Sequence, residues 1–169
     1  MSQETKYSFN QLHAITQDIN EFINNTDQLD RLLLFNLRRN AKKAKEAIEL
    51  LKDDFEQLSE DEMKEAQKFD QEKIKLIKKY GGETEEQNGQ LVLSEDSPNL
   101  PDEFWDDLTE LKTEYDDVLT KANKITKKNQ KLANEPVAEV EFKEIKLEQF
   151  PEQLGTYFTD NFLEFVTTA

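Results

Sequence analysis

The residue types that perform catalysis do not occur here in an arrangement that would support it. His13 is the only histidine, and a general base needs a partner group positioned beside it. No pair of carboxylates stands in an otherwise apolar stretch, where burial could raise a pKa. The aspartate spacings do not match a calcium loop, and the four glycines fall in turns or in the tail, so no phosphate-binding loop is formed. We therefore expect no enzyme, no catalytic or metal-binding residues and no cofactor.

Carboxylates are the most prominent chemical groups, and they are concentrated in one segment. Between Gly81 and Asp117 there are thirteen acidic residues and one basic residue, a net charge of −12 within a chain of net charge −15. Five of the acids repeat at steps of four and three residues, which places them in one stripe beside the apolar seam of a helix: Glu103, Asp107, Glu110, Glu114 and Asp117. Trp105 lies off the seam, and we expect it next to these acids.

This stripe has two interpretations. A run of charges is typical of a solvated helix face, here with a partly buried tryptophan. Alternatively, the acids form a surface with an aromatic anchor for a basic partner, because tryptophan is enriched in binding hot spots. The candidate residues of this acidic face are Glu103, Trp105, Asp106, Asp107, Glu110, Glu114 and Asp117.

Imitation of DNA by the same surface is a less favoured alternative. Eight carboxylates between Asp102 and Asp117 give about one charge per 3 Å of helix axis, whereas duplex DNA has about one per 1.7 Å. A block of lysines between Lys121 and Lys131 follows directly, and such lysines also complement a helix C-terminus.

Composition restricts the partners and the compartment. The net charge of −15 and a pI near 4.5 disfavour direct binding to nucleic acid or to an anionic membrane. Cysteine is absent, and no stretch approaches the about 20 apolar residues of a membrane helix. We expect a cytoplasmic protein.

Apolar periodicity predicts long helices that position the acidic face. A capping box at Ser8 and Gln11 opens the first helix, and Thr26 with Asp27 caps a second. The apolar seam of the second runs from Leu29 to Leu58 and becomes a heptad after Leu37. A second capping box at Ser59 and Glu62 leaves open whether residues 27–80 form one helix or two.

The second half of the chain predicts a ribbon, a return helix and an arm. Asn88-Gly89 is a two-residue hairpin signal within a β-ribbon at about residues 83–94. Pro101 precedes a return helix with a seam from Phe104 to Leu132, the natural antiparallel partner of the earlier heptad helices. Alternation in residues 137–147 predicts an edge strand with a bulge, and the tail from Phe150 onward predicts a short aromatic helix.

The predicted fold is therefore mainly α: an elongated antiparallel helical bundle or coiled-coil hairpin with a small β-ribbon and a C-terminal β/helix arm. Residues 1–134 form the bundle and residues 135–169 the arm. An unpaired strand and aromatic tail could complete the sheet or groove of a neighbouring molecule. The candidate partner-binding residues of the arm are Val140, Phe142, Ile145, Phe158 and Phe162.

Several segments together resemble small acidic bacteriophage proteins of uncharacterised function. The resemblance covers roughly residues 40–151 and is carried by Lys79-Tyr80-Gly81, the Asn-Gly ribbon, residues 101–105, residues 134–142 and Phe150-Pro151. The helix, ribbon, helix order is also similar to that of prefoldin-type chaperone subunits. The phage resemblance implies a virion or assembly component, or an inhibitor of a host system.

We therefore expect a non-enzymatic, phage-type protein that acts through protein–protein contacts, most simply as a virion structural or assembly adaptor that forms homo- or hetero-oligomers. One alternative is an acidic inhibitor of a host defence or nucleic-acid-binding protein, possibly one that imitates DNA. Another is a prefoldin-like chaperone.

Overall fold

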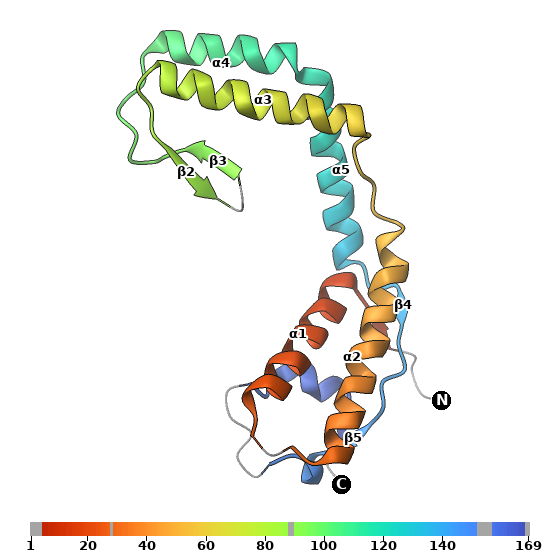
Figure 1. Cartoon of the computed structure of the whole chain (residues 1–169). Helices are drawn as coiled ribbons and strands as arrows, with labels where there is room; N and C mark the ends of the chain where they lie inside the picture. Colours follow the sequence, from red (N-terminus) through yellow and green to blue (C-terminus); the bar gives the residue numbers. More distant parts are fainter. Residues whose placement is uncertain (1–4, 28, 88–89, 152–156, 168–169) are drawn as a thin grey trace. The chain divides into compact units, whose positions relative to one another are not determined.

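The computed structural model describes residues 5–27, 29–87, 90–151 and 157–167 of the chain. Within these residues the protein is mainly helical, with five α-helices and three two-stranded sheets, which confirms the predicted mainly α class (Figure 1). The chain divides into two compact units, which are described separately: unit 1 comprises residues 1–56 and 128–169, and unit 2 comprises residues 57–127. This division differs from the predicted boundary after residue 134, because the C-terminal segment packs on the first two helices.

Unit 1 is built on α1 (Phe9–Asn25) and α2 (Arg31–Lys52), which pack against each other. The capping box predicted for α1 is present: the Gln11 amide donates to Ser8 Oγ at 3.2 Å, and the Ser8 amide donates to Gln11 Oε1 at 2.8 Å. The cap predicted for the second helix at Thr26 and Asp27 is wrong. Asp30 caps α2 instead, because its carboxylate accepts from two amides of the first turn.

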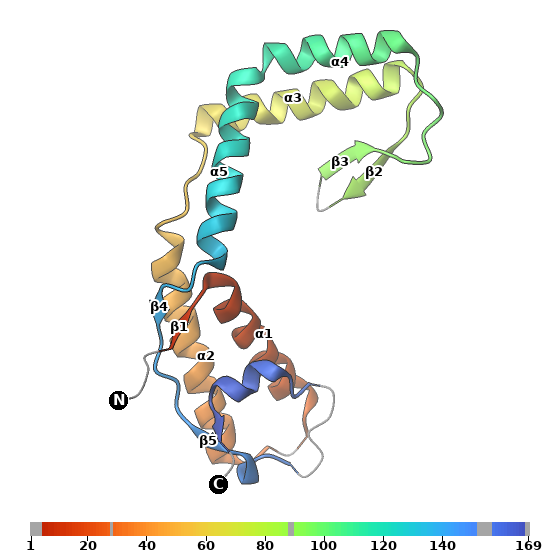
Figure 2. The same ribbon diagram turned by 180° about the vertical axis from the view of Figure 1, so that it is seen from behind.

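The C-terminal segment supplies the remaining elements of unit 1. These are β4 (Ala138–Glu139), β5 (Ile145–Lys146), η1 (Leu147–Gln149), η2 (Asp160–Glu164) and β6 (Val166–Thr167). Strand β4 pairs antiparallel with β1 (Lys6–Tyr7), and β5 pairs parallel with β6 (Figure 2). The predicted strand over residues 137–147 is therefore two short strands, and both are paired within the chain.

Asn40 of α2 fixes the segment between these strands. Its side chain is fully buried, donates to the Lys143 carbonyl at 2.9 Å and accepts from the Lys143 amide at 2.7 Å. The two bonds satisfy both backbone groups of Lys143, as a neighbouring strand would. A second helix side chain, Lys43, donates to the Glu141 carbonyl.

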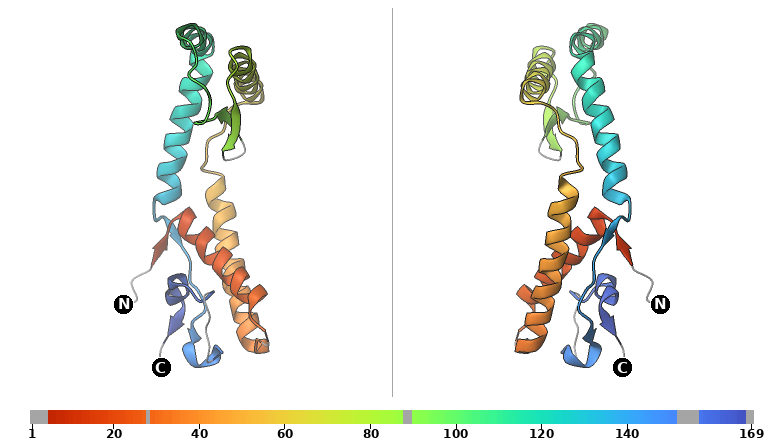
Figure 3. Two further views of the ribbon diagram at one scale, coloured as in Figure 1. Left: turned by 90° about the vertical axis from the view of Figure 1, so that its left-hand side faces the viewer. Right: turned by 90° about the vertical axis from the view of Figure 1, so that its right-hand side faces the viewer.

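Aromatic side chains of the tail complete the core of unit 1. Phe22 of α1 lies edge-to-face with Phe162 at 5.2 Å and with Phe150 at 5.7 Å between ring centroids. Phe162 is fully buried in the 3-10 helix η2, which replaces the α-helix predicted for the tail. Figure 3 shows this segment beside α1 and α2, whose apolar faces it covers.

Residues 27–80 form two helices and not one. Helix α2 ends at Lys52, and α3 (Glu60–Lys79) begins after Ser59. The second capping box begins α3: the Glu62 backbone amide donates to Ser59 Oγ at 3.3 Å, and the Ser59 backbone amide donates to Glu62 Oε2 at 2.9 Å.

Unit 2 is an antiparallel helical hairpin of α3 and α4 (Asp102–Glu114), with a β-ribbon at the connected end. Ring contacts give the register, since Tyr80 meets Phe104 at 5.8 Å and Phe69 meets Tyr115 at 5.7 Å. The ribbon pairs β2 (Thr84–Gln87) with β3 (Gln90–Leu93), as predicted, while its Asn88-Gly89 turn lies outside the described residues. Ile77, Phe104 and Leu108 form a buried cluster that includes Leu93 at its edge.

The predicted return helix is interrupted at one residue. Helix α4 ends at Glu114, and α5 (Asp116–Asn134) begins after Tyr115, whose φ of −104° and ψ of 15° are not helical. Tyr115 is buried against Phe69, so the break coincides with a packed core position. The return helix is predicted to pack on the earlier heptad helices: its first part, α4, packs on α3, whereas α2 packs on α1.

No helix within the described residues is both long and apolar enough to cross a membrane.

Candidate protein-binding surface

The acidic face begins where α4 begins. Pro101 occupies the N-cap position with φ −66°, and Asp102 and Glu103 stand in the first turn, where carboxylates are stabilised by the helix dipole. Phe104, Leu108 and Leu111 bury one side of the helix against α3. The carboxylates flank this apolar side at helical spacing, so the packing of α4 determines which way they point.

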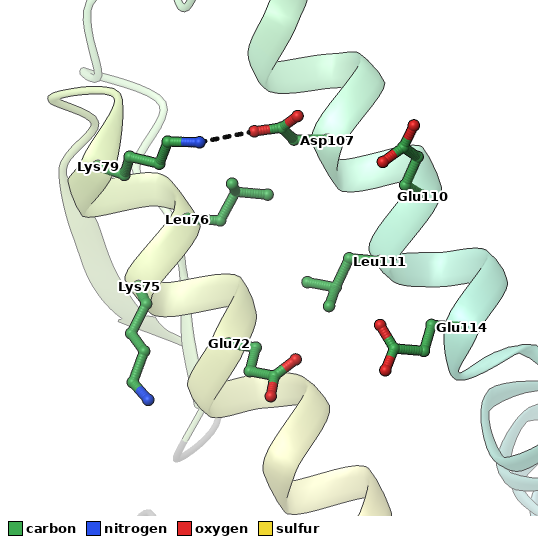
Figure 4. A pocket seen from close by; sticks show the side chains of 8 residues that line it. All are labelled: Glu72, Lys75, Leu76, Lys79, Asp107, Glu110, Leu111 and Glu114. Carbon is green, nitrogen blue, oxygen red and sulfur yellow. Dashed lines mark hydrogen bonds and ion pairs between the residues drawn. The ribbon is translucent and has the colours of Figure 1, made fainter.

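A groove of about 520 Å³ lies between α3 and α4 of unit 2. Leu76 from α3 and Leu111 from α4 form its apolar floor (Figure 4). Six charged side chains surround them, four carboxylates and two lysines: Glu72, Asp107, Glu110, Glu114, Lys75 and Lys79. We call this site the hairpin groove, and its charged groups sum to −2.

Asp107 already bonds two side chains at the C-terminal end of α3. Lys79 Nζ lies 2.9 Å from Asp107 Oδ2, and the Tyr80 hydroxyl donates to the same oxygen at 2.8 Å. The hydrogen bonds from Lys79 and Tyr80 hold the pKa of Asp107 below its ordinary value and raise the pKa of Lys79 and of Tyr80. Lys79 Nζ also stands 4.8 Å from the centre of the Tyr80 ring. Asp107 therefore anchors the hairpin, and it is not a free carboxylate for a partner.

Glu110 and Glu114 are the available carboxylates of the groove. Both are exposed, and neither forms an ion pair with another described residue. Glu72 faces Glu114 across the groove (Figure 4). Near the start of α3, Glu62 pairs with Lys121 of α5 at 2.5 Å, and the hydrogen bond from Lys121 lowers the pKa of Glu62.

Trp105 does not lie beside the acidic stripe, contrary to expectation. At about 100° per residue it stands roughly 140–180° around α4 from Glu103, Asp107, Glu110 and Glu114. Its ring packs edge-to-face on Phe104 at 4.9 Å, and the residue remains 49% exposed. The predicted combination of an acidic face with an aromatic anchor on one surface is therefore wrong, because the apolar seam separates the two.

The remaining members of the acidic face are dispersed. Glu103 and Asp106 are exposed near the start of α4, with Asp106 at the edge of the stripe. Asp117 belongs to α5, beyond the break at Tyr115, and lines a second groove together with Lys112 and Glu114. Of the seven predicted residues, the structure thus brings Asp107, Glu110 and Glu114 together in the hairpin groove.

The candidate residues of the arm lie in the core of unit 1. Ile145 and Phe162 are fully buried, and the other three are partly buried against the same cluster: Val140, Phe142 and Phe158. Phe142 packs edge-to-face on Tyr7 at 5.2 Å, and burial together with the neighbouring Glu164 raises the pKa of Tyr7 to about 12. These side chains stabilise the fold, and they do not form an exposed docking surface.

Sequence reasoning missed Lys79 and Tyr80, which neutralise Asp107. Both lie 27–28 residues from their partner, so no local spacing signals the contact. His13 is exposed on α1 and packs on Phe9 at 4.9 Å between ring centroids. Within the described ranges, no cluster of three potential metal ligands is present.

Comparisons of the chain with protein-family models, with curated proteins and with solved structures found no match.

Proposed function

We propose that this protein is a non-enzymatic, protein-binding component of an assembly, and that the hairpin groove binds a basic side chain of its partner. The observation that carries the proposal is the pairing of an apolar floor with a carboxylate rim. The methylene stem of an arginine or lysine lies on leucines such as Leu76 and Leu111, while its head group bonds carboxylates.

Two carboxylates of the groove can bind the basic head group of the partner. Glu110 and Glu114 lie one turn apart on α4 and are exposed on the same side of the helix. A guanidinium presents several donors in a planar fork, so it binds such a pair more specifically than an ammonium does.

Virion or particle assembly remains our preferred role for a protein of this kind. The packing of the arm side chains Val140, Phe142, Ile145, Phe158 and Phe162 into the core of unit 1 changes how we propose that it works, because the surface for assembly moves from the C-terminal arm to the hairpin. An acidic inhibitor of a basic host protein would use the same groove. DNA imitation is not favoured, since Lys75 and Lys79 interrupt the carboxylates at the groove itself.

The test removes the two free carboxylates and leaves the hairpin anchor intact. Glu110→Gln with Glu114→Gln deletes the charge of the groove rim, while Glu135→Gln with Glu144→Gln removes the same charge from exposed positions of unit 1. Affinity capture with the tagged full chain from its native source, followed by mass spectrometry, identifies the partner without depending on the reactivity of the carboxylates.

We expect wild type and the unit 1 control to capture the same partner. The groove variant should lose the partner by about tenfold or more, the scale for a charged contact of about 1.4 kcal/mol. Equal capture by the groove variant would refute the proposed binding site.

A further inference from the structure

A basic and apolar surface stands on α2, where the acidic composition of the chain gives no reason to expect one. Between Arg31 and Lys45 there are six basic residues and no acidic residue, and this segment holds all three arginines of the protein. Arg31 also occupies the first turn of α2, where the helix dipole disfavours a positive charge. Interaction with the helix dipole therefore does not account for the charge at Arg31.

Phe35 is at the centre of this surface and is 62% exposed. Its helical neighbours at three and four residues on either side are Arg31, Leu32, Arg38 and Arg39. All four are exposed, Leu32 to 55%, and within the described residues none of the three arginines forms an ion pair. We call these five residues together with Lys42 the arginine–phenylalanine surface.

The opposite side of α2 forms the core contacts of the helix, so the arginine–phenylalanine surface is not needed for folding. Leu33, Leu37, Ala41 and Ala44 are buried against α1 and the C-terminal segment, so the core needs of the helix are already met. Burying a phenylalanine stabilises a protein, whereas here the ring stays in water among arginines. Exposed aromatic and arginine side chains are the types enriched in protein interfaces.

We propose that the arginine–phenylalanine surface docks onto the hairpin groove of a second copy of this chain, which gives head-to-tail self-assembly. This inference rests on the proposed function of the groove and names its partner. Charge complementarity carries it: exposed arginines on α2 match exposed carboxylates on α4, and the groove has the apolar floor that an arginine stem requires.

The two surfaces differ, so the contact is heterologous. After two molecules have bound, one keeps a free arginine–phenylalanine surface and the other keeps a free groove. Such contacts repeat until they close in a ring or extend as a filament. A nucleic acid is a weaker candidate for the α2 surface, because the chain carries a net charge of −15 and acids resume at Glu46.

Sedimentation velocity of the purified full chain, over a concentration series at low and high salt, tests the inference. We expect the weight-average mass of wild type to rise with concentration and to fall with added salt, because the contact is electrostatic. Arg38→Gln with Arg39→Gln removes one half of the contact, and Glu110→Gln with Glu114→Gln removes the other. Lys124→Gln with Lys127→Gln is the matched control, since it removes two exposed positive charges from α5.

Each of the two surface variants should weaken self-association by about tenfold or more, whereas the control should associate like wild type. An equimolar mixture of the two variants retains one intact contact. It should therefore form a dimer that does not grow further, while wild type continues to larger species.

Three results would overturn the inference: a wild-type protein that stays monomeric throughout the series, a control weakened as much as the surface variants, or a variant mixture that remains monomeric. Tighter binding of a single-stranded oligonucleotide to α2 than of a second copy would reassign the surface to nucleic acid. A monomeric wild type whose groove variant still loses a partner captured from the native source would leave the proposed function standing and remove only the self-assembly.

Discussion

Replacing Asn40 by alanine tests whether the C-terminal segment belongs to the fold of unit 1. The side chain of Asn40 is fully buried and makes two hydrogen bonds, of 2.9 and 2.7 Å, with the backbone of Lys143. These bonds join residues that are 103 positions apart in the chain. Their loss should therefore loosen the segment around Lys143 as well as lower the free energy of unfolding.

The expected magnitude follows from the two bonds. Each hydrogen bond contributes about 1 kcal/mol net, and a backbone group left without its partner costs about 1–3 kcal/mol when it is buried. Lys143 is itself exposed, so water replaces part of what Asn40 provided. We expect a loss of about 2–3 kcal/mol, which with a urea m-value of about 1–3 kcal/mol per molar lowers the midpoint by about 1 M or more.

Two measurements check this expectation. Urea unfolding followed by circular dichroism gives the free energy, and amide hydrogen exchange locates the change, which should include faster exchange at Lys143. Asn10→Ala is the matched control, because Asn10 bonds the Asn134 side chain at an exposed position, and we expect a change within about 0.5 kcal/mol. If Asn40→Ala also stays within about 0.5 kcal/mol of wild type, with unchanged exchange, the docking of the segment onto α2 is refuted.

Three further predictions concern the two units. Phe162→Ala should lower the free energy of unfolding by about 3–5 kcal/mol, because a fully buried ring is lost, and chemical denaturation measures it. The pKa of Tyr7 is raised to about 12, so the stability that Tyr7 contributes is fully present below about 10, the ordinary tyrosine value, and is lost as the pH rises from there through about 12. The pKa values of Tyr80 and Tyr115 are also raised, so ultraviolet titration should show late phenols, of which the Tyr7 phase titrates earlier in Glu164→Gln. The pKa of Asp107 is lowered, so the stability that Asp107 contributes is present above about pH 3.9 and is lost as the pH falls through the pKa of the folded state. Lys79→Met should raise the pKa of Asp107 in a carboxyl NMR titration, and an unchanged pKa would contradict its role as an anchor.

Local signals in the sequence predicted the ends of several helices correctly. The capping boxes at Ser8 and Ser59 depend on groups three residues apart, so both can be recognised without knowledge of the fold. Pro101 with the acids after it gave the start of α4 for the same reason. The β-ribbon also followed from its own residues, because strands β2 and β3 are neighbours in the chain.

Nonlocal contacts account for what the sequence did not predict. The alternation around Val140 and Phe142 is typical of an edge strand, but nothing in that pattern shows that Asn40 lies opposite Lys143. Asn40 itself falls on the apolar side of α2, where an amide looks like an interruption of the heptad until its two backbone partners are known. The exposed arm was therefore a reasonable inference from local pattern, and the long-range hydrogen bonds overturn it.

The net charge of the whole chain does not show how charge is distributed over its surfaces. Residues 81–117 carry −12, yet the hairpin groove sums to −2, because α3 contributes Lys75 and Lys79 to the same site. The chain as a whole carries a net charge of −15, yet the charged side chains of the arginine–phenylalanine surface on α2 are three arginines and one lysine. Screening limits the reach of exposed charges to about 8 Å at physiological salt, so a partner responds to these local groups and not to the total. A protein that repels its own copies at long range therefore still has two surfaces of opposite charge through which those copies can bind.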